Sequence, residues 1–82
     1  MAKFHYVYIL QSEVDPARFY TGFTDDLGAR FKNHNTGLVR HTSKWKPWRV
    51  KTYVAFSDRA RAVELEKYLK TASGRALLKA RL

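Results

Sequence analysis

The stretch FHYVYILQ, residues 4–11, decides the fold expected for this chain. Successive side chains of a strand point to opposite faces. Both alternating sets are largely apolar here: Phe4, Tyr6, Tyr8 and Leu10, and then His5, Val7, Ile9 and Gln11. A strand that is apolar on both faces is typically covered on both faces. The stretch therefore predicts the central strand of a sheet.

A second strand is predicted directly after the first. The loop SEVDPAR, residues 12–18, contains a turn-forming Asp-Pro pair, and RFYTGF, residues 18–23, is rich in strand-forming aromatic residues. The simplest arrangement is an antiparallel pair of strands. Gly22 is unusual in such a strand, because it offers no side chain to pack. It indicates a bulge, a bend, or a place where another backbone or a ligand comes close.

A helix and a third strand follow. Thr24 is a suitable N-cap, the two aspartates after it place negative charge in the first helical turn, and Gly37 is a natural end of the helix. Residues 38–47 show no regular period and predict a loop that ends at Pro47. Residues 48–56 alternate between apolar and more polar side chains, which predicts a third strand with one wetter face.

The end of the chain predicts two more helical segments. Ser57 is the predicted cap of a long helix over residues 58–72, which Ser73-Gly74 interrupts, and residues 75–82 predict a short terminal helix. The element order is then ββαβα plus a short C-terminal helix. This order predicts one α+β domain over residues 1–82, in which a small three-stranded antiparallel sheet is flanked by helices.

The excess of positive charge lies in the second half of the chain. The 82 residues include 16 Lys and Arg against 7 Asp and Glu, for a net charge of +9. Residues 1–39 hold four residues of each sign, whereas residues 40–82 hold twelve basic and three acidic residues. A one-sided basic surface attracts polyanions, and nucleic acid is favoured over a membrane because no strongly apolar helix face accompanies the charge. The alternative is a soluble protein with a lysine-rich surface.

The sequence argues against a secreted or membrane protein. It has no cysteine, so we expect neither a disulfide-linked partner nor a thiolate metal site. The first ten residues, MAKFHYVYIL, are too short and too mixed for a signal peptide, and no apolar run approaches the ~18 residues of a membrane span. We therefore expect a cytoplasmic protein, whose oligomeric state the sequence leaves open.

Two pairs of side chains can meet beside the predicted sheet. If the first two strands pair, Tyr8 and Tyr20 lie near each other; the alternative is that both are core residues with hydroxyls at the rim. Arg30 and His34 stand one helical turn apart, one as a fixed cation and the other as a donor or acceptor near neutral pH. Their alternative is a solvated helix face. If that face turns toward the tyrosines, a phosphate meets an arginine on one side and phenols on the other.

Glu66 lies at the edge of an apolar helix stripe. The stripe consists of Ala62, Leu65, Leu69 and Ala72. An edge carboxylate suits a metal ligand or an ion pair, whereas Glu64 falls toward solvent. The alternative for Glu66 is a favourable i,i+4 pair with Lys70. One carboxylate suffices for Mg²⁺, which keeps several waters and takes other ligands from phosphate oxygens, whereas a zinc site is poorly supported because the three histidines lack ligand spacing.

RHTSKWKPWRVK, residues 40–51, interleaves cations with tryptophans. Its cationic residues are Arg40, Lys44, Lys46, Arg49 and Lys51. Such a pattern suits single-stranded or distorted nucleic acid, through backbone neutralisation and base stacking. The alternative is structural. We expect Trp48 to anchor the third strand, and Trp45 stays among the nucleic-acid-binding candidates.

Taken together, these segments resemble the GIY-YIG endonuclease family, in particular its small bacterial members. YVYIL at 6–10 resembles the GIY element, and YTG at 20–22 resembles the YIG element. TDDLGARFKNHNTG at 24–37 is similar to the family's helix, KPW at 46–48 to the lead into the third strand, and RAVELEKYLK at 61–70 to the Glu-bearing helix. The match covers nearly the whole chain in the right order.

The resemblance implies a site and a reaction. The implied catalytic residues are Tyr8, Tyr20, Arg30, His34 and Glu66, with Glu66 as the ligand of Mg²⁺ or Mn²⁺. Gly22 is then expected to leave the space beside Tyr20 open for the substrate. The implied activity is hydrolysis of DNA phosphodiester bonds by an endonuclease or nickase, on branched or single-stranded DNA, in DNA repair or processing.

The sequence also departs from the family pattern. Tyr6 replaces the first glycine of the GIY element, and His41 stands where related sequences often have tyrosine. The C-terminal SGRALLKARL has no asparagine, which some members place close to the active site. The alternative reading is therefore a nucleic-acid-binding module that keeps the fold without catalysis.

Overall fold

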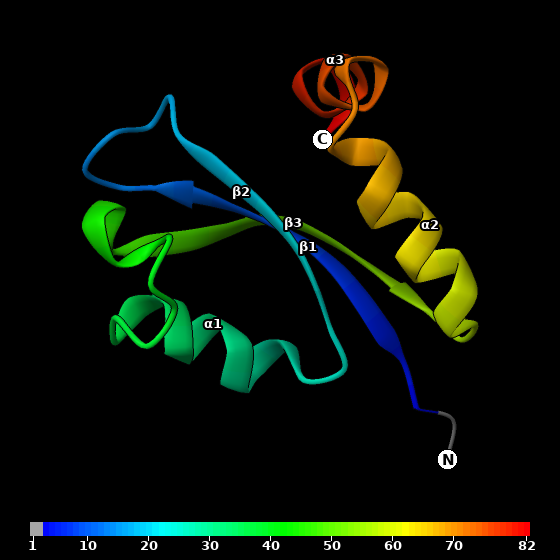
Figure 1. The fold of residues 1–82 in the computed structure, drawn as a ribbon, viewed down its shortest axis with the longest axis horizontal. Coiled ribbons are helices and arrows are strands. Elements are labelled where there is room, and N and C mark those ends of the chain that lie inside the picture. Colours follow the sequence, from blue (N-terminus) through cyan, green and yellow to red (C-terminus); the bar gives the residue numbers. More distant parts are fainter. Residues whose placement is uncertain (1–2) are drawn as a thin grey trace.

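A three-stranded antiparallel sheet forms the centre of the computed structural model, which describes residues 3–82 (Figure 1). Its strands are β1 (His5–Ser12), β2 (Phe19–Thr24) and β3 (Trp48–Phe56), and their order across the sheet is β2-β1-β3. Both neighbours run antiparallel to β1. The predicted central position of the first strand and the predicted antiparallel pairing are thus confirmed.

Helices cover both faces of the sheet, as the two apolar faces of β1 require. On one face, α1 (Leu27–Asn35) packs through Leu27 and Phe31 against the buried Tyr8, Leu10 and Trp48. Figure 1 shows α1 on the side of the sheet opposite to the other two helices.

The second face is covered by α2 (Arg59–Leu69) and α3 (Ala72–Arg81). The residues that fill this second core are Val7, Ile9, Ala62, Leu69 and Leu78. Of the predicted apolar stripe, Ala62 and Leu69 are buried and Leu65 is partly buried, but Ala72 is exposed because the chain has already turned into α3. The predicted α+β class is confirmed.

Aspartates, and not the preceding hydroxyl residues, cap the first two helices. The Asp26 carboxylate accepts a hydrogen bond from the amide of Ala29 at 3.1 Å, so the predicted cap at Thr24 is wrong by two residues. Asp25 lies outside the helix and contacts the imidazole of His5. Asp26 therefore acts as the cap of the helix and Asp25 pairs with His5, so neither places its charge in the first turn.

The second long helix is shorter than predicted at both ends. Its N-cap is Asp58 and not Ser57, and it ends at Leu69 instead of continuing to Ala72. Thr71 caps the next helix by accepting a hydrogen bond from the amide of Gly74 at 3.1 Å. The predicted break at Ser73-Gly74 is thus wrong, because the Thr71 cap restarts the helix before that glycine.

Residues 38–47 form the predicted irregular connection, with two local features. They contain one short 3₁₀ helix, η1 (Ser43–Trp45), and a cis peptide bond joins Lys46 to Pro47. The side-chain amide of Asn35 ties α1 to this side of β3, because it donates to the carbonyl of Trp48 at 3.0 Å and accepts from its amide at 2.5 Å.

No helix within residues 3–82 is long and apolar enough to cross a bilayer. Met1 and Ala2, which belong to the segment expected not to be a signal peptide, lie outside the described residues.

Two helical glycines differ sharply in the space around them. A methyl group on the buried Gly74 would overlap the carbonyl oxygen of Tyr68, which is backbone and cannot move aside, whereas Gly28 is exposed and nearly free of neighbours. We expect Gly74→Ala to lower the free energy of unfolding by about 1–3 kcal/mol or more through overpacking. The matched control Gly28→Ala should raise it by up to about 1 kcal/mol. Urea denaturation measures both, and equal effects would contradict this packing.

Candidate active site

The Tyr8 phenol fills the space that Gly22 leaves. The two residues are directly opposite each other on β1 and β2. A Cβ atom at Gly22 would overlap the Tyr8 hydroxyl and lie 2.9 Å from the ring carbon Cε1. The expectation that Gly22 leaves an open space for the substrate is therefore wrong in its detail. The close approach is real, but the group that approaches is the Tyr8 ring of the same sheet.

Helix α1 brings two polar side chains to the Tyr8 hydroxyl. The Nε2 atom of His34 lies 2.8 Å from it, and the Nε–H of Arg30 donates to it at 3.3 Å. His34 is fully buried and Tyr8 is 1% exposed. The helix face that carries Arg30 and His34 is thus turned toward the tyrosines, and not toward solvent.

Thr42 determines which nitrogen of His34 carries the proton. The Thr42 hydroxyl donates to the carbonyl of Val39 at 3.2 Å, so it accepts a hydrogen bond from Nδ1 of His34, 2.7 Å away. With its proton on Nδ1, the neutral imidazole presents the lone pair of Nε2 to the Tyr8 hydroxyl. Hydrogen bonds therefore run in one direction, from Tyr8 to His34 to Thr42 to Val39.

Burial and nearby charge set the protonation of this cluster. Burial, together with the positive charge of Arg30, lowers the pKa of His34 to about 4, so the imidazole is neutral at pH 7. Burial also raises the pKa of Tyr8, and the hydrogen bond from Arg30 opposes that rise. The same hydrogen bond raises the pKa of Arg30, which stays charged.

Tyr20 is the more accessible of the two phenols. Its ring centroid lies 4.9 Å from that of His34 and 6.2 Å from that of Tyr8. Unlike Tyr8 it is only partly buried, and it lines a groove of about 340 Å³ together with Arg30 and Arg40. Tyr20 and the two arginines therefore form the side of the cluster that an anionic ligand can reach.

Glu66 belongs to the helical layer on the other face of the sheet from α1. It lies on α2, its side chain is 16% exposed, and its carboxylate forms an ion pair with Lys70. Its negative charge contributes to the raised pKa of Tyr8, so the two residues interact through charge. The predicted position at the edge of the apolar stripe is confirmed, whereas Glu64 is exposed.

The described residues hold no cluster of three or more His, Cys, Asp or Glu side chains that could bind a metal. Glu66 offers a single carboxylate, which fits an ion such as Mg²⁺, whose remaining ligands are waters and phosphate oxygens.

Nearly all of the described chain matches a known catalytic domain. Residues 4–79 match the model of the GIY-YIG catalytic domain. The chain belongs to the GIY-YIG family. The resemblance to this family is thereby confirmed, and Tyr8, Tyr20, Arg30, His34 and Glu66 all lie within the matched residues.

Similar proteins fall into two groups. A UPF0213 protein of Staphylococcus haemolyticus is 35% identical over 96% of this chain and 94% of its own length. The solution NMR structure of the UPF0213 protein BH0048 from Bacillus halodurans matches with a TM-score of 0.57 and 30% identity, over 94% of this chain and 83% of that one. The structure-specific endonuclease subunit SLX1 homolog of Giardia intestinalis is 35% identical over 74% of this chain, which spans only 18% of that relative.

The tryptophans of this GIY-YIG domain have different roles. Trp48 is buried in the core under α1, and its indole N–H donates to the carbonyl of Thr42 at 2.9 Å, so it anchors β3 as expected. Trp45 is partly buried beside the core, and Lys44 lies over its ring at 5.2 Å.

The remaining basic candidates are distributed over two regions. Arg49 and Lys51 lie on the wetter face of β3, where Arg49 donates to Gln11 and the Lys51 ammonium lies 5.6 Å from the ring centroid of Phe19. Arg40 lines the groove beside Tyr20, and Lys46 is exposed next to Gly37.

Thr42 is a part of the site that the sequence does not predict. It lies in the irregular connection over residues 38–47, where no local pattern marks it. Its role arises because this connection folds back against His34 of α1.

Gly22 and Tyr8 should be energetically coupled. In the wild-type background, Gly22→Ala should cost about 1–3 kcal/mol of unfolding free energy, because the added methyl displaces the Tyr8 ring. In the Tyr8→Ala background the same change should cost nothing, since the overlapping ring is absent. Urea denaturation of the four proteins gives the coupling energy. An equal cost in both backgrounds would show that Gly22 serves the backbone and not Tyr8.

The buried His34 should make the domain sensitive to acid. Because the pKa of His34 is lowered to about 4 from an ordinary value of 6.5, only the unfolded chain binds a proton there between these values. The free energy of unfolding should therefore be constant above pH 6.5 and fall between pH 6.5 and about 4. Urea titrations across this range should show a flatter pH dependence for His34→Gln. His41→Gln, at an exposed histidine, should keep the wild-type slope, and a wild-type slope in His34→Gln would contradict the assignment.

Proposed function

We propose that this chain is a divalent-metal-dependent endonuclease or nickase, which hydrolyses DNA phosphodiester bonds in DNA processing or repair in the cytoplasm. The supporting observation is the directed series of hydrogen bonds from Arg30 through Tyr8 and His34 to Thr42. It gives a phenol oxygen both a cationic donor and a neutral proton acceptor. Relatives named structure-specific endonuclease subunits, from Giardia intestinalis and Meyerozyma guilliermondii, make branched DNA the first substrate to test.

In this proposal Tyr8 takes a proton from the attacking water. Because burial raises the pKa of Tyr8, its hydroxyl keeps its proton at neutral pH and is not a base by itself. With the His34 proton on Nδ1, as the Thr42 contacts imply, the Tyr8 hydroxyl donates its own proton to the lone pair on Nε2. As the Tyr8 oxygen receives the proton of water, its own proton passes to His34, and no free phenolate is needed. Thr42 holds the imidazole in the tautomer that can accept it.

Arg30 and Tyr20 are proposed to hold the phosphate. Arg30 stays charged and lies beside both phenols, where it can stabilise negative charge that develops on the phosphoryl oxygens. Tyr20 lines the accessible groove and can donate to a non-bridging oxygen. Arg40 in the same groove extends the positive charge along the strand.

Glu66 is the residue proposed to hold Mg²⁺ or Mn²⁺. Its carboxylate lies at the edge of the buried surface and now pairs with Lys70, which must release it when a cation binds. An ion held there would polarise the phosphate and stabilise the leaving oxygen.

Cleavage assays test this proposal directly. Purified protein is incubated with nicked, branched and single-stranded DNA in Mg²⁺, Mn²⁺ or EDTA. Cleavage should require the metal and be lost in Glu66→Gln, while the matched control Glu64→Gln on the same helix keeps wild-type activity. Tyr8→Phe should lower the single-turnover rate by about 10²–10⁴-fold, the usual contribution of general acid–base groups.

Two outcomes would contradict the proposal. Cleavage that persists in EDTA or in Glu66→Gln would exclude the metal role of that residue. Binding to all three DNAs without cleavage of any would favour the non-catalytic nucleic-acid-binding module.

A further inference from the structure

A second groove, of about 540 Å³, begins at the catalytic cluster and runs away from it. It shares Tyr20 and Thr42 with that cluster, and its far wall is formed by Arg18 and Trp45. The groove joins the β1–β2 loop to η1, two segments that are distant in sequence. Its volume lies within the range of about 300–1,000 Å³ that is typical of small-molecule sites.

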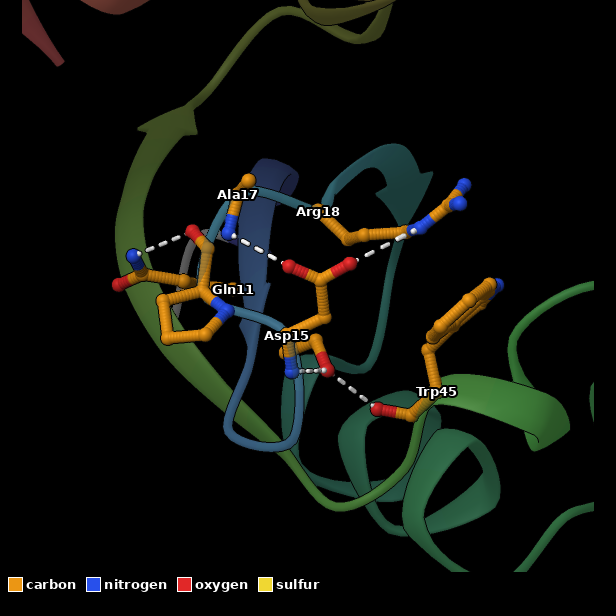
Figure 2. Close-up of polar contacts among 7 residues, drawn as sticks. Gln11, Asp15, Ala17, Arg18 and Trp45 are labelled. Atoms are coloured by element: carbon orange, nitrogen blue, oxygen red, sulfur yellow. Dashed lines mark hydrogen bonds and ion pairs between the residues drawn. The ribbon is translucent and has the colours of Figure 1, made fainter.

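The far wall is a stacked pair of flat groups. The guanidinium carbon of Arg18 lies 3.8 Å from the ring centroid of Trp45, and Figure 2 shows the two side chains side by side. Asp15 orients the guanidinium, because its carboxylate accepts from Nε of Arg18 at 3.4 Å. The same carboxylate accepts from the amide of Ala17 at 3.2 Å, which fixes the loop.

Trp45 is held in place from the opposite side. The Ser12 hydroxyl donates to the carbonyl of Trp45 at 2.6 Å, and the Trp45 ring packs against the core that contains Trp48. The Ser12 hydroxyl also accepts from the amide of Asp15 at 3.1 Å. One hydroxyl thus ties the loop that carries Arg18 to the helix that carries Trp45, so the stack is preorganised.

The chemistry of this wall matches a nucleotide. Among the described residues, Arg18 forms its side-chain hydrogen bond through Nε alone, so its two terminal nitrogens are available to a phosphate. A flat base stacks on a guanidinium plane or an aromatic ring, and each such contact is worth about 1–3 kcal/mol. Phe19, which is 39% exposed and has Lys51 near its ring, adds another aromatic surface with a cation.

A base that is paired within a duplex cannot stack against this wall. In a duplex both faces of a base are covered by its neighbours, so only a base that has left the stack can lie against Arg18 and Trp45. Because Tyr20 borders both this groove and the catalytic cluster, a base in the groove belongs to a nucleotide close to the phosphate under attack.

We propose that the groove of Asp15, Arg18, Tyr20 and Trp45 binds an unpaired nucleobase, and its phosphate, next to the scissile phosphate. This inference rests on the proposed nuclease function and specifies its substrate, namely DNA with unpaired nucleotides beside the cut. The groove accepts any base type, since stacking tolerates every base.

Fluorescence of 2-aminopurine tests the groove without cleavage. The probe is placed one to three nucleotides from a branch point as an unpaired base, or at the same position in a fully paired duplex, and binding is measured in EDTA. Wild-type protein should quench the unpaired probe. Arg18→Ala and Trp45→Ala should weaken binding of the unpaired DNA by about 5- to 100-fold and that of the duplex by about twofold or less.

Conservative variants separate stacking from charge and folding. Trp45→Phe keeps a ring and should retain most of the affinity for the unpaired DNA. Arg18→Lys keeps the charge but loses the planar group, so it should resemble Arg18→Ala. Arg61→Ala removes one exposed charge from α2 and should weaken both DNAs equally. Arg18 is itself exposed, so its variants report on the groove even if Trp45→Ala destabilises the domain.

The outcomes distinguish this inference from the proposed function. The base site is overturned if the Arg18 and Trp45 variants lose affinity for both DNAs alike. It is also overturned if the wild type does not quench the probe. Both results hold whether or not the protein cleaves DNA. Selective loss for the unpaired DNA supports the base site even if no cleavage is detected, and in that case only the nuclease function fails.

Discussion

The contact between the Tyr8 phenol and the bare backbone of Gly22 is the constraint on which the site depends. It lets a large side chain of the central strand extend across the neighbouring strand without distorting the sheet. Because Tyr8 is buried, its hydroxyl needs hydrogen-bond partners, and α1 supplies them through Arg30 and His34. The contacts that place α1 on the sheet are therefore also the contacts that build the site.

A polar cluster in the interior of a small domain is costly unless every group is satisfied. Within residues 3–82, no buried side-chain nitrogen or oxygen lacks a hydrogen-bond partner. Thr42 completes the cluster. Its hydroxyl accepts a hydrogen bond from His34, and its carbonyl accepts one from the indole N–H of Trp48. The same hydrogen bonds that stabilise the fold thus hold the Tyr8 hydroxyl and the His34 imidazole in fixed positions, which is the preorganisation that the proposed proton transfer requires.

The site combines an interior part with an accessible rim. Tyr8 and His34 are buried and form the interior part. Tyr20 belongs to the rim, because it lines both grooves. Glu66 comes from the helical layer on the other side of the sheet and acts on Tyr8 through its charge. An extended anionic ligand can contact the rim while Tyr8 and His34 remain buried behind it, and the stacked Arg18 lies at one end of that rim.

The sequence by itself determined the elements and the family. Apolar residues on both faces of 4–11 required a central strand, and the alternation of 48–56 required a half-exposed one, because burial follows directly from side-chain period. Helix ends were less certain, since Thr24 and Asp26 are both good caps and only the path of the chain chooses between them. The tertiary structure alone decided what fills the space at Gly22, which tautomer His34 adopts and where Arg18 stacks. These depend on contacts between segments far apart in the chain, for which no local pattern exists.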